Sequence, residues 1–371
     1  MQQSSRTGRV VFVDYLRLIA CFMVILVHCI EPFYLGGEGT LIKDVSDAVW
    51  CTVLDSALRA AVPLFVIASS YLLFPLKYDT ATFFRKRFVR VCIPLVIWSL
   101  LYALIPYYGS AEGFDRDANL GRLLLNFNPH SGHLWFIYML LGVYLAMPLL
   151  SPWAEKVSKK GEELFLGIWA FTTLIPFLRQ AAAAVTGSPE LWGEANWNEY
   201  GIFQYVSGFI GYMVLGHYFR KYVPEMSWKK TLAVAVPLWI GGYALTAGWF
   251  WMTMPRDFPV EGPVSIAVKM ETSWQFCSTG VAMTSVAYFM LIRKLTCSGS
   301  FYRKAVLPGA GISYGVYLMH MFVLVFFHQT VTAWGLGTPL HIFVTAVLTF
   351  FSCFILARVL SLVPGSRCLL G

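Results

Sequence analysis

Charged residues are scarce in this sequence. Of its 371 residues only 13% are Asp, Glu, Lys or Arg, whereas 57% are hydrophobic and the mean hydropathy is +0.62. Soluble domains carry about 25% charged residues, so this chain has too few polar groups to cover its surface in water. The shortage excludes a soluble enzyme, a disordered chain and a nucleic-acid-binding protein, although the net charge is +8. We expect an all-α, polytopic integral membrane protein.

Cysteine pairs with metal-binding or redox spacing are absent. The eight cysteines are spread along the chain, mostly within apolar runs, and no two of them form a CxxC pair. Without such a pair the sequence gives no sign of a structural metal site or a dithiol redox centre. We therefore expect buried free thiols and no metal.

Long polar segments are also absent, and hydrophobic runs take their place. A helix crosses the bilayer core with about 20 apolar residues. No stretch between the runs is long enough to fold separately, so we expect residues 1–371 to form a single transmembrane domain without a separate soluble domain. The sequence contains ten runs of the required kind, at 11–33, 48–74, 91–109, 133–151, 163–184, 201–219, 231–252, 272–292, 308–330 and 339–361.

The basic residues gather on one side of such a ten-span chain. Twenty of the 28 Lys and Arg residues lie in the N-terminus, the even-numbered loops or the C-terminus, if Arg358, near the end of the tenth run, is counted with the C-terminus. Loops rich in Lys and Arg stay on the cytoplasmic side of a membrane. The distribution predicts that both termini are cytoplasmic, and the positive charge then reflects orientation and attraction to anionic lipid.

The first hydrophobic run contains four ionisable residues, Asp14, Arg17, His28 and Glu31. At about 100° per residue, all four fall on one helical stripe about 100° wide, and Arg17 and His28 are about 16 Å apart along the axis. Ionisable groups at membrane depth are costly unless they are paired or meet water, so the stripe indicates a functional site.

A structural interpretation of the same residues is also open. Asp14 and Arg17 are suitable surface anchors, and His28 and Glu31 are then part of the outer loop. A continuous polar stripe on an apolar helix favours function, because lipid would not tolerate it. Histidine changes charge near neutral pH, and Glu31, about one turn after His28, is placed to orient its ring. We predict a catalytic group of His28, Arg17, Glu31 and Asp14.

A basic segment precedes the third run, at residues 84–90. Its Arg87 and Arg90 are one helical turn apart, a spacing that suits two guanidinium groups holding one phosphate. Anchoring at the cytoplasmic surface explains the segment equally well, since any basic residue serves that purpose. We predict that Arg87 and Arg90, together with Arg17, bind an anionic cofactor.

Polar residues also interrupt two later runs. The fourth begins with HSGHLWF at 130–136, and the ninth contains GISYGVYLMH at 311–320. HxxH without a nearby carboxylate is a weak metal signal, and Gly, Ser and Tyr in a membrane helix favour close packing. His320, at the end of the second segment, is either a buried core residue or part of a polar channel. The residues that we predict to contact the substrate are His133, Trp135, Tyr314, Tyr317 and His320.

Taken in order, these motifs resemble those of membrane-bound acyltransferase family 3, which includes bacterial polysaccharide O-acetyltransferases. Arg17 and His28 match the family's Arg-x10-His element, and Arg87 and Arg90 match its Arg-x-x-Arg element. The segments at 133–136 and 312–320 are similar to its later signatures. The resemblance covers nearly the whole chain.

The resemblance implies an enzyme that transfers an acyl group, usually acetyl, from cytoplasmic acyl-CoA to a hydroxyl of a glycan or glycolipid. It implies that His28 acts as a general base or as an acyl relay. The implied location is the bacterial inner membrane, with acyl-CoA, the glycan acceptor and membrane lipid as partners. A polysaccharide or amphiphile transporter is the main alternative, because intramembrane charges and helices interrupted by Gly or Pro also mark transport paths.

Overall fold

Helices build most of the described chain. The computed structural model describes residues 9–36, 39–125, 128–192, 203 and 205–371. Within these residues, eight helical segments are long and apolar enough to cross a membrane, and there are three short strands. The prediction of an all-α, polytopic membrane protein is confirmed.

Nine of the ten expected runs have a counterpart of membrane-spanning length. Eight are single segments: Val11–Phe33, Val45–Leu73, Thr80–Leu104, Pro129–Lys156, Lys159–Thr186, Trp228–Thr253, Tyr302–Thr332 and Thr338–Leu360. The run at 272–292 corresponds to two pieces, Val264–Trp274 and Thr279–Ile292, which meet at a bend of 43°.

The run at 201–219 differs from the expectation. Helix α9 begins only at Phe209 and ends at Tyr222, and its 14 residues are about 21 Å long, less than the hydrocarbon core of about 30 Å. Gly208, directly before it, has a φ of +73°, a left-handed backbone that does not continue a right-handed helix. Residues 201, 202 and 204 lie outside the described part of the chain.

Polar side chains mark where several helices begin. Ser, Asp and Asn favour the position before a helix because their side chains accept a hydrogen bond from an otherwise unpaired backbone N–H. Asp79 accepts from Thr82 N at 2.9 Å at the start of α4 (Thr80–Leu104), and Ser227 accepts from Lys230 N at 3.3 Å at the start of α10 (Trp228–Thr253). Asp44 and Ser158 do the same for α2 (Val45–Leu58) and α7 (Lys159–Thr172). These polar residues separate the apolar runs that the sequence shows.

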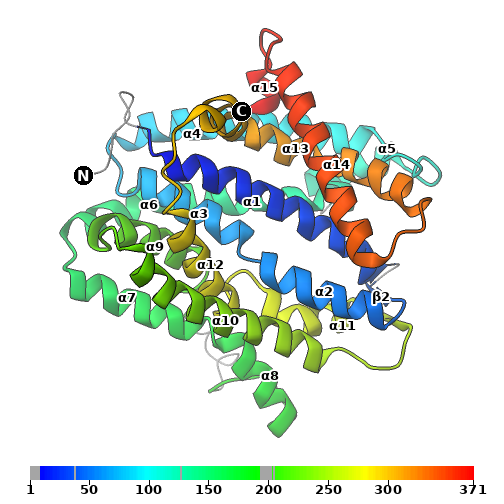
Figure 1. Ribbon diagram of the computed structural model, residues 1–371, viewed down its shortest axis with the longest axis horizontal. Coiled ribbons are helices and arrows are strands. Elements are labelled where there is room, and N and C mark those ends of the chain that lie inside the picture. Colours follow the sequence, from blue (N-terminus) through cyan, green and yellow to red (C-terminus); the bar gives the residue numbers. More distant parts are fainter. Residues whose placement is uncertain (1–8, 37–38, 126–127, 193–202, 204) are drawn as a thin grey trace. The chain divides into compact units, whose positions relative to one another are not determined.

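Contacts within the chain define two units. The first consists of Met1–Cys29, Leu76–Pro148 and Cys297–Gly371. In it, α13 and α14 pack along each other (Figure 1): the His328 and His341 rings are 4.8 Å apart, and farther along the pair Phe354 packs on Gly309. Its elements are α1 (Val11–Ile30), α4 (Thr80–Leu104), α5 (Arg116–Leu125), η2 (Pro129–Leu134), the first part of α6 (Trp135–Lys156), η5 (Tyr302–Val306), α13 (Leu307–Thr332), α14 (Thr338–Leu360) and α15 (Arg367–Leu370).

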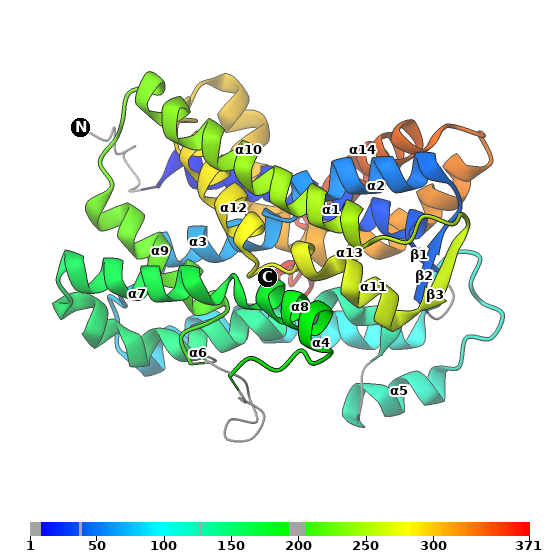
Figure 2. The same ribbon diagram turned by 90° about the horizontal axis from the view of Figure 1, so that it is seen from below.

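The second unit consists of Ile30–Pro75 and Leu149–Thr296. Its three strands pair antiparallel in the order β1-β2-β3 (Figure 2), with Leu35 opposite Thr40 and Thr40 opposite Gly262. It contains the whole of α9 and the last part of α6. Its other elements are η1 (Glu31–Phe33), β1 (Leu35–Gly36), β2 (Gly39–Ile42), α2 (Val45–Leu58), α3 (Ala61–Leu73), α7 (Lys159–Thr172), α8 (Ile175–Thr186), α10 (Trp228–Thr253), β3 (Val260–Pro263), α11 (Val264–Met270), η4 (Glu271–Trp274) and α12 (Thr279–Ile292).

Small residues let α10 and α12 pack closely in this unit. A Cβ atom at Gly242 would meet the carbonyl oxygen of Gly280, and one at Gly280 would meet the carbonyl oxygen of Gly242. Membrane helices associate through close contact of this kind, since lipid supplies no hydrophobic drive between them. The two glycines therefore bring the two backbones together.

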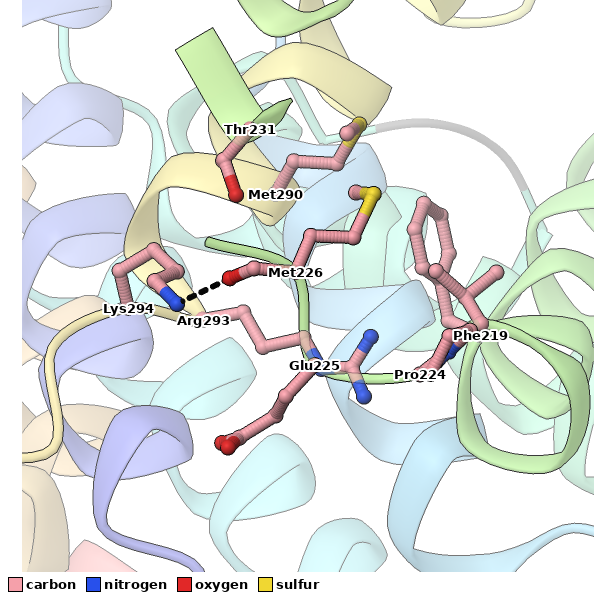
Figure 3. A pocket seen from close by; sticks show the side chains of 9 residues that line it. Phe219, Pro224, Glu225, Met226, Thr231, Met290, Arg293 and Lys294 are labelled. Carbon is pink, nitrogen blue, oxygen red and sulfur yellow. Dashed lines mark hydrogen bonds between the residues drawn. The ribbon is translucent and has the colours of Figure 1, made fainter. Parts of the chain in front are cut away.

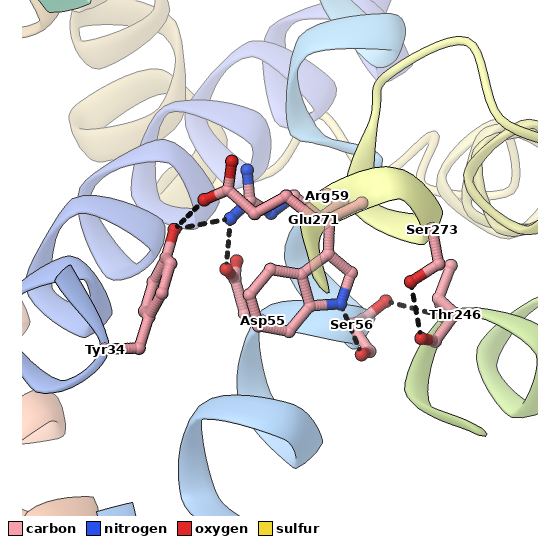
Figure 4. A network of polar contacts seen from close by, with 8 residues as sticks. Tyr34, Asp55, Ser56, Arg59, Thr246, Glu271 and Ser273 are labelled. Carbon is pink, nitrogen blue, oxygen red and sulfur yellow. Dashed lines mark hydrogen bonds and ion pairs between the residues drawn. The ribbon is translucent and has the colours of Figure 1, made fainter. Parts of the chain in front are cut away.

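A buried polar network joins α2 to the segments around η1 and η4 (Figure 4). Arg59, directly after α2, pairs with Asp55 and donates to the Tyr34 hydroxyl at 3.0 Å. Tyr34 donates to Glu271 at 2.8 Å, and the Arg59 guanidinium lies 4.8 Å from the ring centre of Trp274. Asp55 is 0% exposed and Arg59 is 8% exposed, so the ion pair is shielded from bulk solvent.

Candidate active site

Helix α1 carries three of the four ionisable residues predicted for the site. Asp14, Arg17 and His28 lie within the uninterrupted helix Val11–Ile30, so Arg17 and His28 keep their spacing of about 16 Å along the axis. Asp14 is buried, whereas Arg17 and His28 are half-buried. The helix thus holds the partly exposed side chains of Arg17 and His28 at a fixed separation along its axis.

Glu31, the fourth predicted residue, lies just beyond helix α1. Helix α1 ends at Ile30, and Glu31 opens the 3₁₀-helix η1. Pro32 gives the reason, because the residue before a proline is disfavoured in the α conformation. Glu31 also belongs to the second unit, whereas His28 belongs to the first.

Asp14 is held by two neighbours. Its carboxylate accepts from Arg9 Nε at 2.7 Å and Nη2 at 3.1 Å, and from the Tyr302 hydroxyl at 2.7 Å. The hydrogen bonds that Arg9 donates to the Asp14 carboxylate raise the pKa of Arg9 above its ordinary value. Both carboxylate oxygens are thus engaged in a clamp that ties the start of α1 to η5.

We expect Tyr302→Phe to lower the free energy of unfolding by about 1–3 kcal/mol, because it removes a hydrogen bond to a buried carboxylate. Acyl transfer should stay near the wild-type rate if Asp14 serves only as a clamp. Thermal unfolding in detergent and an acyl-transfer assay check the two halves. A loss of transfer with unchanged stability would instead assign Asp14 to the chemistry.

In the first unit, the charge of Arg17 interacts with that of Arg90. Arg17 also interacts electrostatically with Asp14 and Tyr144. Arg87 and Arg90 are one turn apart on α4, where Arg87 is half-buried and Arg90 exposed. Arg17 and Arg90, which were predicted from separate motifs, thus interact through their charges. Several guanidinium groups near one another suit the phosphates of an anionic ligand.

The C-terminal segment lies beside this basic group. Arg90 Nε donates to Gly371 O at 3.1 Å, and Trp98 Nε1 donates to Leu369 O at 2.9 Å. Tyr314, predicted to contact substrate, donates its hydroxyl to Val91 O at 3.0 Å. In Arg90 it is Nε, and not a terminal guanidinium nitrogen, that donates to Gly371 O.

Three histidines from separate parts of the sequence form a cluster in the first unit. The ring centroids of His28 and His320 are 5.1 Å apart, those of His133 and His320 are 5.2 Å apart, and those of His28 and His133 are 6.3 Å apart. They come from α1, η2 and α13. The structure therefore unites the predicted catalytic histidine with two residues predicted for substrate contact. We call these three residues the histidine cluster.

Hydrogen bonds fix the surroundings of the histidine cluster. The Tyr317 hydroxyl donates to His133 O at 2.5 Å, and the Tyr102 hydroxyl donates to Leu318 O at 2.8 Å. The Tyr102 ring also lies 4.8 Å from the His133 ring. Tyr102 was not predicted, because a single tyrosine in an apolar run gives no signal in the sequence.

The remaining predicted residue is Trp135, the half-buried first residue of α6, two positions after His133. All eight cysteines are free, as predicted, but the prediction that they are buried holds only in part. Four are buried, Cys92 and Cys277 are half-buried, and Cys297 and Cys368 are exposed, so burial is wrong for the last two. Within the described part of the chain, no group of three or more His, Cys, Asp or Glu side chains is arranged to hold a metal ion. That the enzyme uses no metal stays a prediction.

A pocket in the second unit contains none of the predicted site residues. Lys294 donates to Met226 O at 2.6 Å across it (Figure 3), and its volume of about 20 Å³ holds about one water molecule. Its lining comprises Phe219, Val223, Pro224, Glu225, Met226, Thr231, Met290, Arg293 and Lys294.

Comparison with known proteins identifies the class of the molecule. The acyltransferase 3 family model, described as an acyltransferase domain, matches residues 10–358. The chain belongs to membrane-bound acyltransferase family 3, and it is a membrane acyltransferase. Comparisons with curated proteins and with solved structures gave no match.

Proposed function

We propose that the protein transfers an acyl group, acetyl in the simplest case, from cytoplasmic acyl-CoA to a hydroxyl of a glycan or lipid-linked glycan. The observation that carries the proposal is the layout of α1. His28 lies in a cluster of three imidazoles, and Arg17 lies about 16 Å away along the same helix, where its charge interacts with that of Arg90 of α4. The enzyme acts in the bacterial inner membrane with both termini cytoplasmic.

The donor binds at the end of α1 that carries Arg17. Its phosphates contact Arg17, Arg87 and Arg90 through charge-assisted hydrogen bonds, which guanidinium groups make in pairs. The thin pantetheine arm then extends along α1, over a length that matches the axial separation of Arg17 and His28. The thioester reaches the histidine cluster while the nucleotide stays at the membrane surface.

His28 acts on the reacting atoms by one of two routes. As a general base it takes the proton of the acceptor hydroxyl, the oxygen attacks the thioester carbonyl, and the departing CoA thiolate receives that proton. As a nucleophile it forms an acyl-imidazole and releases CoA, and the acceptor hydroxyl then attacks the acyl carbon. Both routes consume one hydroxyl and release one thiol, with no net change in protons.

Purified protein in lipid nanodiscs, given labelled acetyl-CoA, tests the proposed function. We expect CoA thiol to be released only when a glycan acceptor is present, and the label to appear as an ester on that glycan. Movement of an unmodified glycan across a vesicle, without release of CoA from any acceptor, would support the transporter alternative and contradict the proposal.

Replacing both Arg87 and Arg90 by Ala should raise the KM for acetyl-CoA. Loss of a hydrogen bond between charged groups costs about 1.5–3 kcal/mol, which corresponds to about 10- to 100-fold in affinity. Arg85→Ala is the matched control, since Arg85 is an exposed cation on the same helix. Steady-state kinetics give the comparison. An unchanged KM in the double variant would mean that Arg87 and Arg90 do not bind acetyl-CoA and serve only as membrane anchors.

A further inference from the structure

We propose that residues 366–371 position Arg90 for the phosphates of the acyl donor. The main-chain oxygen of Gly371 holds one edge of the guanidinium group, and the terminal nitrogens then bind the donor. We call residues 366–371, which include α15, the strap. The inference rests on the proposed function, because that function makes Arg90 a donor-binding residue. It gives a role to a segment that none of the sequence motifs includes.

The strap is a structured turn that lies against α4 and α13. Gly365, directly before it, has a φ of +86°, a left-handed backbone that glycine adopts without strain. Within the strap, Leu370 N donates to Ser366 O and Gly371 N donates to Arg367 O, both at 2.9 Å. These bonds close one helical turn, so the strap presents its last residues in a defined geometry.

A buried leucine anchors the strap between the two helices. Leu370 is 6% exposed, and a Cβ atom at Gly315 of α13 would overlap its Cδ2 atom. The missing side chain of Gly315 therefore leaves the space that the leucine fills. From α4, Trp98 Nε1 donates to Leu369 O at 2.9 Å. Packing on one helix and a hydrogen bond from the other thus fix the strap in place.

Arg90 is the residue that the anchored strap holds. Its Nε donates to Gly371 O at 3.1 Å. The terminal nitrogens of a guanidinium group carry further N–H donors, and the bond at Nε does not use them. Arg90 is exposed, and a long exposed side chain loses rotamer freedom when it binds a ligand. An Arg90 that the strap has already ordered loses less of that freedom.

The surroundings of Arg90 favour an anion. Its charge interacts with that of Arg17 on α1, and two cations near one another repel until an anion such as a phosphate binds between them. The backbone beside Arg90 is held as well, because the Tyr314 hydroxyl of α13 donates to Val91 O at 3.0 Å. The strap therefore holds the guanidinium group where a phosphate offsets the repulsion.

Leu370→Asn tests this role, because a polar side chain disfavours the buried space beside Gly315 and releases the strap. We expect the Kd for CoA, measured by titration calorimetry, to rise about three- to tenfold, which is the cost of ordering one long side chain on binding. The kcat for acyl transfer should stay within about twofold of wild type. Cys368→Asn is the matched control, since Cys368 is exposed on the same strap, and its Kd should equal that of the wild type.

The same change in an Arg90→Ala background separates positioning from a general structural effect. There we expect Leu370→Asn to alter the Kd by less than about 1.5-fold, because the side chain that the strap holds is absent. An equally large rise in both backgrounds would show that the strap acts through another residue and would overturn the inference. So would a Kd for folded Leu370→Asn within about 1.5-fold of wild type.

Nuclear magnetic resonance of the wild-type protein supplies a readout that needs no variant. We expect the Nε–H proton of Arg90 to exchange with water several-fold more slowly than that of Arg85, an exposed arginine of the same helix. Equal exchange rates would overturn the inference. A wild-type protein that binds CoA but transfers no acyl group would contradict the proposed function alone, because the comparison of Kd values still decides the role of the strap. A wild-type protein that binds no CoA would overturn both.

Discussion

His28→Ala should abolish acyl transfer while leaving the protein folded and able to bind acetyl-CoA. A positioned general acid or base contributes about 10²- to 10⁴-fold to a rate, and an acyl relay cannot work at all without its nucleophile. His28 is half-buried at the end of a regular helix, so truncation to Ala removes few packing contacts. The expected loss therefore falls on kcat.

The matched control for this variant is His130→Ala. His130 lies on η2 three residues before His133, and its ring contacts Phe114 and Tyr107 rather than the histidine cluster. Its substitution should leave kcat near the wild-type value. Release of CoA from labelled acetyl-CoA measures both variants. If His28→Ala keeps at least about a tenth of the wild-type kcat, His28 does not take part in the reaction as base or nucleophile.

The second large effect concerns stability. We expect Arg59→Met to destabilise the protein by about 3–5 kcal/mol, because it leaves the buried Asp55 carboxylate without its cation. The same change removes the donor to the Tyr34 hydroxyl and the cation over Trp274. Thermal unfolding in detergent should show a clearly lowered midpoint.

Two comparisons make the cause specific. Replacing both partners, Arg59→Met with Asp55→Leu, should recover much of the loss, since no unpaired charge remains. Arg256→Met is the matched control, because Arg256 also lies over a tryptophan ring, Trp251 at 4.5 Å, but is exposed. An equal shift for Arg256→Met and Arg59→Met would mean that contact with tryptophan, and not the buried ion pair, carries the stability.

The sequence predicts the fold class well because hydrophobic runs of membrane length are its dominant feature. Eight runs appear as single segments of sufficient length and a ninth as a bent pair. The exception, the run at 201–219, shows the limit of counting apolar residues. A single left-handed glycine at position 208 sets where α9 begins, and hydropathy does not report backbone conformation.

The candidate site was partly predictable from helical spacing. Arg17 and His28 keep their relation because nothing between them interrupts α1. Glu31 lies outside that helix, because Pro32 follows it and α1 ends at Ile30. The partners of Asp14 and the meeting of His28 with His320 depend on contacts between distant segments, and a single sequence holds no record of those distances.

Mass spectrometry of cell-surface glycans, with this gene deleted and then restored in its source organism, tests the central claim most directly. We predict that the deletion removes an acyl ester from a glycan, that the wild-type gene restores it, and that the His28→Ala gene does not restore it at equal protein level. Full restoration by His28→Ala, or identical glycans with and without the gene, would contradict the account.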